Sequence, residues 1–155
     1  MKNKSLYKPL IENLLSIFNE HLKTVVLFGS QARSKTVLKR DHDTFVAIDG
    51  LPRDPLKRLK MVRKAVLNIP LQVNFISKTP EEVALNLTPL LLDICVDGFC
   101  LYGEDYFEPY RSRALRALRQ SGLKREKVDR QWYWRFEKTP QKDWELSWEG
   151  YRELT

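Results

Sequence analysis

The sequence predicts an α/β fold: a small mixed sheet covered by helices and followed by a C-terminal helix and β-hairpin. Hydrophobic periodicity alternates between helical and strand spacing over about the first hundred residues. Residues 111–155 then change character, because they hold all four tryptophans and 12 basic against 7 acidic side chains. With 155 residues, 43% of them hydrophobic, the chain can bury a core. We therefore expect a domain over 1–104 and a basic, Trp-rich extension over 105–155.

The first half of the predicted domain alternates helices and buried strands. Apolar residues at helical spacing predict an amphipathic helix over 6–22. Two β-branched runs, 23–28 and 44–48, are typical of buried strands, and the first ends at a glycine. A basic helix with one apolar face is expected over 52–67.

The second half continues the alternation. Residues 71–77 alternate apolar and polar side chains, which predicts a third strand. The run Thr-Pro-Glu-Glu at 79–82 is a capping box that begins a helix. A Thr-Pro pair predicts a buried helix over 89–97, followed by a short strand over 99–102.

The C-terminal extension is predicted to hold a helix over 106–120 and one β-hairpin. Large apolar residues alternate on both sides of a polar loop at 139–143, and we expect all of them on one hairpin face: Trp132, Trp134, Phe136, Trp144, Leu146 and Trp148. A lone hairpin is marginal in water, so this face should pack on the extension's helix or on a dimer mate. A homodimer is therefore one expectation.

The residues most suited to chemistry lie between the first two predicted strands, where Gly29-Ser30 and Asp41-His42-Asp43 are separated by ten residues. Glycine lets the backbone approach a phosphate closely, and the serine hydroxyl and helix-start amides favour anions. Two carboxylates two residues apart on an extended segment point to one side. Such a pair can hold Mg²⁺ ions that also bind phosphate oxygens.

This spacing resembles the GS-x10-D-x-D signature of the minimal nucleotidyltransferases in the DNA polymerase β superfamily. The resemblance implies that Gly29, Ser30 and Arg33 bind a nucleoside triphosphate. It also implies that Asp41 and Asp43 are catalytic and hold Mg²⁺ at a two-ion site, which could also accept Mn²⁺. The expected reaction moves AMP from ATP to an acceptor. Stand-alone proteins of this kind resemble antitoxins that adenylylate a helical HEPN ribonuclease, so such a partner is expected.

One position departs from that pattern and leaves an alternative open. Asn74 stands where the family usually has a third carboxylate, and an amide can neither carry a negative charge nor accept a proton as aspartate would. The alternative is a catalytically decayed module that binds nucleotide, RNA or a protein partner. His42 is interpreted as a structural side chain, and Asp93 and Asp97 as the polar edge of a buried helix.

Composition adds weaker expectations about partners and location. The formal net charge of +7 favours polyanions, and an extension rich in tryptophan and arginine could stack unpaired bases of RNA. We recognise no signal peptide and no run of about 20 apolar residues, so a cytoplasmic protein without a membrane span is expected.

Overall fold

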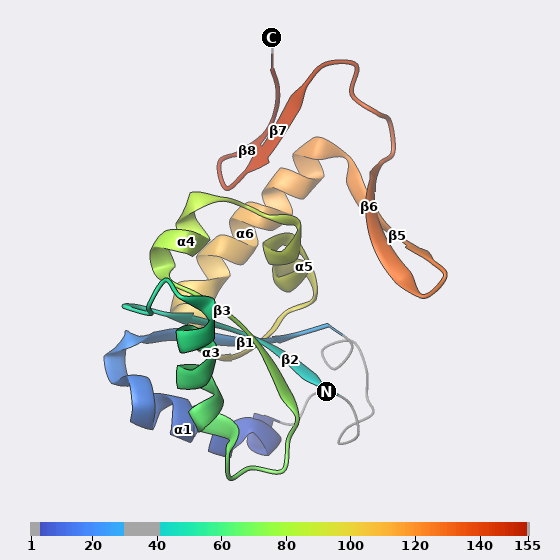
Figure 1. Ribbon diagram of the computed structural model, residues 1–155. Coiled ribbons are helices and arrows are strands. Elements are labelled where there is room, and N and C mark those ends of the chain that lie inside the picture. Colours follow the sequence, from blue (N-terminus) through green and yellow to red (C-terminus); the bar gives the residue numbers. More distant parts are fainter. Residues whose placement is uncertain (1–3, 30–40, 155) are drawn as a thin grey trace.

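The computed structural model describes residues 4–29 and 41–154, and a four-stranded mixed sheet lies at its centre (Figure 1). The strand order is β3-β2-β1-β4, with β1 antiparallel to both of its neighbours and β2 parallel to β3. The strands are β1 (Leu22–Phe28), β2 (His42–Ile48), β3 (Val73–Lys78) and β4 (Phe99–Tyr102). All four predicted strands are therefore confirmed, with ends shifted by one or two residues.

Helices cover both faces of this sheet (Figure 1). The α-helices are α1 (Lys8–Phe18), α3 (Pro55–Arg63), α4 (Pro80–Leu85), α5 (Pro89–Asp97) and α6 (Glu104–Ser121). Three 3₁₀ turns accompany them: η1 (Lys4–Tyr7), η2 (Asn19–His21) and η3 (Lys64–Val66). Successive residues of β1 point to opposite faces, so Val25 packs with α1 and α3 while Val26 packs with α5 and α6.

Two predicted helices are shorter than expected. The first ends at Phe18, because η2 turns the chain into β1, which already includes Leu22. The basic helix is reduced to α3 and η3, and its apolar face is not fully buried: Leu56 and Leu67 are exposed, whereas Val62 is buried. The capping box and the Thr-Pro helix start are confirmed, since Thr79 and Thr88 both cap their helices through their side chains.

The prediction of one C-terminal hairpin is wrong, because two hairpins follow α6. The first pairs β5 (Leu123–Val128) with β6 (Gln131–Phe136), and the second pairs β7 (Trp144–Ser147) with β8 (Gly150–Glu153). Asp129 and Arg130 both adopt positive φ, 50° and 70°, which is the geometry of a tight hairpin turn. The alternating tryptophans thus belong to different hairpins.

Trp148 packs the second hairpin against the sheet domain. It lies in the turn between β7 and β8. Its indole is 3% exposed, and Nε1–H donates a 2.7 Å hydrogen bond to the carbonyl of Val83. One hydrophobic cluster joins Trp148 with Val26 of β1 and Ala114 of α6. The extension thus completes the core on this face of the sheet.

None of the helices among the described residues is long and apolar enough to cross a membrane.

Candidate nucleotide site

The candidate site lies at the end of the sheet where β1 finishes and β2 begins. Gly29 follows β1 directly, and the antiparallel register pairs its neighbour Phe28 with Asp43. Gly29 has φ +72°, and a Cβ placed on it would lie 2.6 Å from Oδ2 of Asp43. The left-handed backbone conformation therefore favours glycine, and an added Cβ would force the Asp43 carboxylate to move. The structure thus places Gly29 beside Asp43, while the predicted phosphate contact of Gly29 stays a prediction.

Asp43 and Asn74 face each other across neighbouring strands. The parallel register pairs the two residues, and Asn74 Nδ2–H donates a 3.4 Å hydrogen bond to Oδ1 of Asp43. Asp41 precedes β2, and together with Asn74 it lines a cavity of about 440 Å³. Gly29, Asp41, Asp43 and Asn74 thus share one end of the sheet.

His42 lies between the two aspartates in sequence but points to the other face. Its side chain is fully buried, and Nδ1 is 3.0 Å from the hydroxyl of Tyr7, whose ring it meets edge-on. Burial raises the pKa of the Tyr7 hydroxyl. His42 therefore fixes the start of β2 against η1, as its structural interpretation expected.

The cavity beside Asp41 contains residues that the sequence patterns did not single out for the site. Arg63 of α3, Val66 and Leu67 come from the basic helical segment, and Gln72 and Val73 lead into β3. In the sequence, Arg63 is only one of the basic residues of the helix expected over 52–67. No local sequence signal links that helix to Asp41, because the parallel β2–β3 pairing and the crossover between the two strands bring them together.

Ser30 and Arg33 lie outside the described residues, so their predicted phosphate contacts stay predictions.

The donor set suits a magnesium ion shared with a substrate. Mg²⁺ in proteins is commonly held by one or two carboxylates together with phosphate oxygens, which matches Asp41 and Asp43 beside an open cavity. Within residues 4–29 and 41–154, no cluster of three or more His, Cys, Asp or Glu residues could enclose a metal. The chemistry of Asp41 and Asp43 therefore fits an ion that phosphate oxygens of a substrate also bind.

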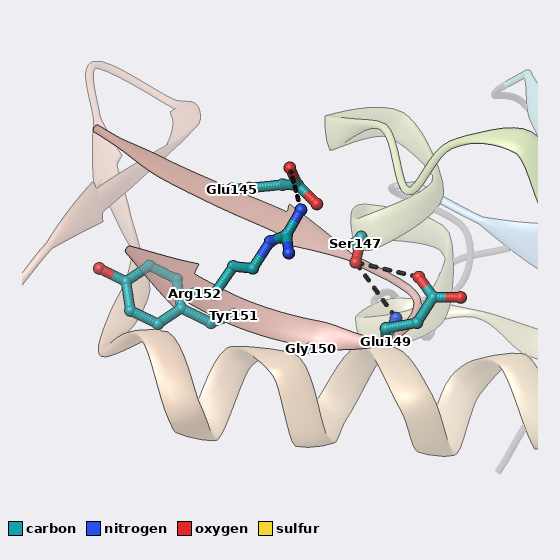
Figure 2. A pocket seen from close by; sticks show the side chains of 6 residues that line it. All are labelled: Glu145, Ser147, Glu149, Gly150, Tyr151 and Arg152. Atoms are coloured by element: carbon teal, nitrogen blue, oxygen red, sulfur yellow. Dashed lines mark hydrogen bonds and ion pairs between the residues drawn. The ribbon is translucent and has the colours of Figure 1, made fainter. Parts of the chain in front are cut away.

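A smaller cavity of about 240 Å³ lies on the β7–β8 hairpin (Figure 2). Figure 2 shows Arg152 reaching Glu145, with 3.2 Å between the bonded atoms, and Ser147 bonded to Glu149 at 3.1 Å. Charged and hydroxyl groups in this cavity thus bond to one another, across the strands for Arg152 and within the turn for Ser147. We interpret it as a feature of the hairpin's own structure.

Comparison with solved structures identifies the fold. A toxin–antitoxin structure with AMP-PNP matches with a TM-score of 0.53 at 19% identity, over 74% of this chain and 85% of that chain. A mutant MntA–HpeT toxin–antitoxin structure matches with a TM-score of 0.51 at 17% identity, over 74% and 84%. The chain has a nucleotidyltransferase-like fold. The α/β fold class expected from the alternating hydrophobic periodicity is therefore confirmed.

Sequence comparison points in the same direction. A Methanocaldococcus jannaschii protein named "Putative protein adenylyltransferase" is 30% identical over an alignment of 95 residues that covers 58% of this chain. The match spans 65% of that relative's length. No family model matches the chain. The resemblance to minimal nucleotidyltransferases thus has support from both sequence and fold.

Proposed function

We propose that this protein is a Mg²⁺-dependent nucleotidyltransferase that moves AMP from ATP to an acceptor. The observation that carries the proposal is the contact between Gly29 and Asp43: a turn without a side chain lies against a carboxylate, beside the cavity that Asp41 lines. The nucleotidyltransferase-like fold and the relative named as an adenylyltransferase support it.

Each residue of the proposed site has a distinct task. Gly29 leaves room for a triphosphate to approach the backbone, while Asp41 and Asp43 bind and orient the divalent ion. When bound, Mg²⁺ would neutralise charge on the phosphate oxygens while an oxygen of the acceptor displaces pyrophosphate in line at the α-phosphorus. Ser30 and Arg33 are assigned to phosphate contacts, in keeping with the sequence pattern.

The proposed acceptor is a helical protein of the HEPN type, with this chain as the antitoxin of the pair. The support comes from its neighbours, since both structures reported above are toxin–antitoxin complexes and one was solved with AMP-PNP. Incubation of this protein with a candidate helical partner, ATP and Mg²⁺ should increase the partner's mass by one AMP. If the partner stays unmodified although this protein binds ATP, the proposed acceptor is wrong. The proposed nucleotide site is not affected by that result.

Titration calorimetry with ATP and Mg²⁺ tests the site itself. We expect the double variant Asp41→Asn, Asp43→Asn to lose at least tenfold in ATP affinity, because it loses two negative charges at almost unchanged volume. Asp49→Asn is the matched control, because Asp49 directly follows β2 at the opposite end of the strand. This variant should bind ATP like the wild type. Equal affinity in all three proteins would contradict the proposal.

A second candidate function is a binding module without catalysis, and Asn74 is the observation that favours it. Its amide occupies the register position opposite Asp43, where a carboxylate could accept a proton from the acceptor. If the wild type transfers no AMP and Asn74→Asp creates metal-dependent transfer, the binding module is favoured. Robust transfer by the wild type eliminates it.

A further inference from the structure

The β5–β6 hairpin stands out from the body of the molecule, yet its base is firmly held (Figure 1). The Arg125 guanidinium makes two hydrogen bonds of 2.6 Å to the Asp97 carboxylate. The Arg125 and Asp97 side chains are only 13% and 9% exposed, and Trp134 Nε1–H donates a 3.0 Å bond to Asp93. The two aspartates on α5 thus anchor the hairpin, which gives them a more specific role than a polar helix edge.

This anchor lies at the end of the sheet that carries the candidate site. Asp97 ends α5, Gly98 follows it, and β4 then begins at Phe99, which pairs with Leu27 two residues before Gly29. The attachment of the hairpin and the glycine turn are therefore connected through one pair of neighbouring strands. A ligand held by the hairpin would lie on the side of the molecule where β1 ends.

Beyond its anchored base, the hairpin presents aromatic and basic side chains to solvent. Trp132 is 41% exposed and Tyr133 is 50% exposed, and as successive strand residues they face opposite sides of the hairpin. Lys127 pairs with Trp132 across the strands, and its Nζ lies 5.8 Å from the ring centroid. Arg130 lies in the exposed turn.

The overall charge of the hairpin is positive. Residues 123–136 carry five basic and two acidic side chains: Lys124, Arg125, Lys127, Arg130 and Arg135 against Glu126 and Asp129. Three of these basic side chains are already in ion pairs: Arg125 with Asp97, Arg135 with Glu126 and Lys124 with Glu137. Lys127, which lies over the Trp132 ring, and Arg130, in the exposed turn, can offer positive charge to an anionic ligand.

We propose that the outer half of the β5–β6 hairpin binds single-stranded nucleic acid. Bases stack on Trp132 and Tyr133, and the backbone phosphates lie against Lys127 and Arg130. Aromatic rings flanked by cations suit this ligand because every unpaired base has a π-face and every nucleotide a phosphate. A protein–protein contact favours the aromatic residues but is depleted of lysine, so the charge of the hairpin favours nucleic acid. This binding is independent of the proposed nucleotidyl transfer.

Fluorescence anisotropy with the full chain tests the proposal, using labelled oligouridylate, oligothymidylate and a duplex of the same length. We expect single strands to bind more tightly than the duplex, with affinity falling steeply as salt rises. Trp132→Ala and Tyr133→Ala should each weaken binding about tenfold. Trp144→Ala is the matched control, because Trp144 is 43% exposed but belongs to the other hairpin.

Charge variants provide an independent readout. Lys127→Gln should reduce the slope of log affinity against log salt by about one unit, as expected for one lost phosphate contact. Lys57→Gln on the exposed face of α3 should leave that slope unchanged. Thermal unfolding of every variant shows whether it is folded, and ATP titration shows whether the nucleotide site is intact.

Three outcomes would overturn the proposal. They are the absence of oligonucleotide binding by the folded wild type, equal binding of duplex and single strand, and binding that Trp132→Ala and Trp144→Ala weaken equally. Loss of a protein partner's affinity in Trp132→Ala, without any oligonucleotide binding, would make the hairpin a protein interface instead. The ATP titration tests the proposed nucleotide site separately from these oligonucleotide measurements.

Discussion

Gly29 is the residue whose replacement should affect the candidate site most selectively. It combines a left-handed backbone, with φ +72°, and the close approach of the Asp43 carboxylate. Asp43 itself is held by its pairing with Phe28 and by the hydrogen bond from Asn74. A side chain added at Gly29 must therefore displace a carboxylate that two neighbouring strands position.

We expect Gly29→Ala to reduce ATP affinity in the presence of Mg²⁺ by at least tenfold and to lower the free energy of unfolding by about 1 kcal/mol. Gly50→Ala separates the two effects, because Gly50 has φ +78° but no neighbouring atom within 4 Å of the added Cβ. The free energy of unfolding of the Gly50→Ala variant should fall by a similar amount, while its ATP affinity stays unchanged. Calorimetry and urea unfolding measure both quantities, and an equal loss of ATP affinity in the two variants would contradict the assigned role of Gly29.

Part of the site could be predicted from residue types and spacing alone. Gly29, Asp41 and Asp43 form a local pattern whose chemistry follows from a missing side chain and two carboxylates two residues apart. Arg63 and Gln72 could not be found in this way, because they reach the cavity through the packing of a helix and a parallel strand. Tertiary neighbours of this kind leave no periodicity in the sequence.

Among the elements, α4 shows how a short helix is fixed by its first turn. Thr79 and Glu82 form the capping box, and Glu82 also pairs with Arg58 of α3 at 2.8 Å. Burial raises the pKa of the Glu82 carboxyl, but its bonds to Thr79 and Arg58 outweigh burial, so the pKa lies below its ordinary value of 4.5. The charged form is therefore favoured in the folded protein.

The stabilisation from Glu82 is present above about pH 4.5 and is lost as the pH falls through the lower pKa of the folded state. We expect Glu82→Gln to lower the free energy of unfolding at pH 7 by at most about 1 kcal/mol, since the side chain is partly exposed. The difference between wild type and variant should shrink between pH 5 and pH 3. Thermal unfolding at several pH values measures it, and a difference independent of pH would be inconsistent with this linkage.

The two C-terminal hairpins show why strand pairing could not be predicted from apolar alternation in the sequence. Strand β5 reads Leu-Lys-Arg-Glu-Lys-Val, so it has no apolar alternation to distinguish it from a solvated loop. Its turn uses Asp129 and Arg130 rather than a glycine pair. The alternating tryptophans of β6 therefore predict pairing with the next apolar run in the sequence. In the structure β6 pairs instead with β5, which precedes it.

At the scale of the whole molecule, the core crosses from the sheet into the C-terminal extension. Trp148 closes one hydrophobic cluster and bonds to Val83, whereas Trp144 on the same hairpin is 43% exposed. Two tryptophans four residues apart thus have very different environments. The effects of substituting each tryptophan on the free energy of unfolding therefore show whether the extension shares the core of the sheet domain or folds on its own.

We expect Trp148→Ala to lower the free energy of unfolding by about 3–5 kcal/mol, because it removes a large buried side chain and leaves a cavity. Trp148→Phe should cost about 1–3 kcal/mol, since the Val83 carbonyl loses its donor. Trp144→Ala should cost less than either. Urea unfolding followed by circular dichroism measures all three, and a Trp148→Ala loss no larger than that of Trp144→Ala would show that the extension contributes little to the core.

The position of Trp148 also has a consequence for how the protein is made. Its partners in the cluster include Val26 on the central strand β1, more than a hundred residues earlier in the chain. During translation, the sheet is complete at Tyr102, yet one side of it keeps an open apolar surface until Trp148 has emerged from the ribosome. The nascent chain therefore passes through a stage in which Trp148 does not yet cover the apolar side chains of this cluster, and transiently exposed apolar surface of this kind favours aggregation.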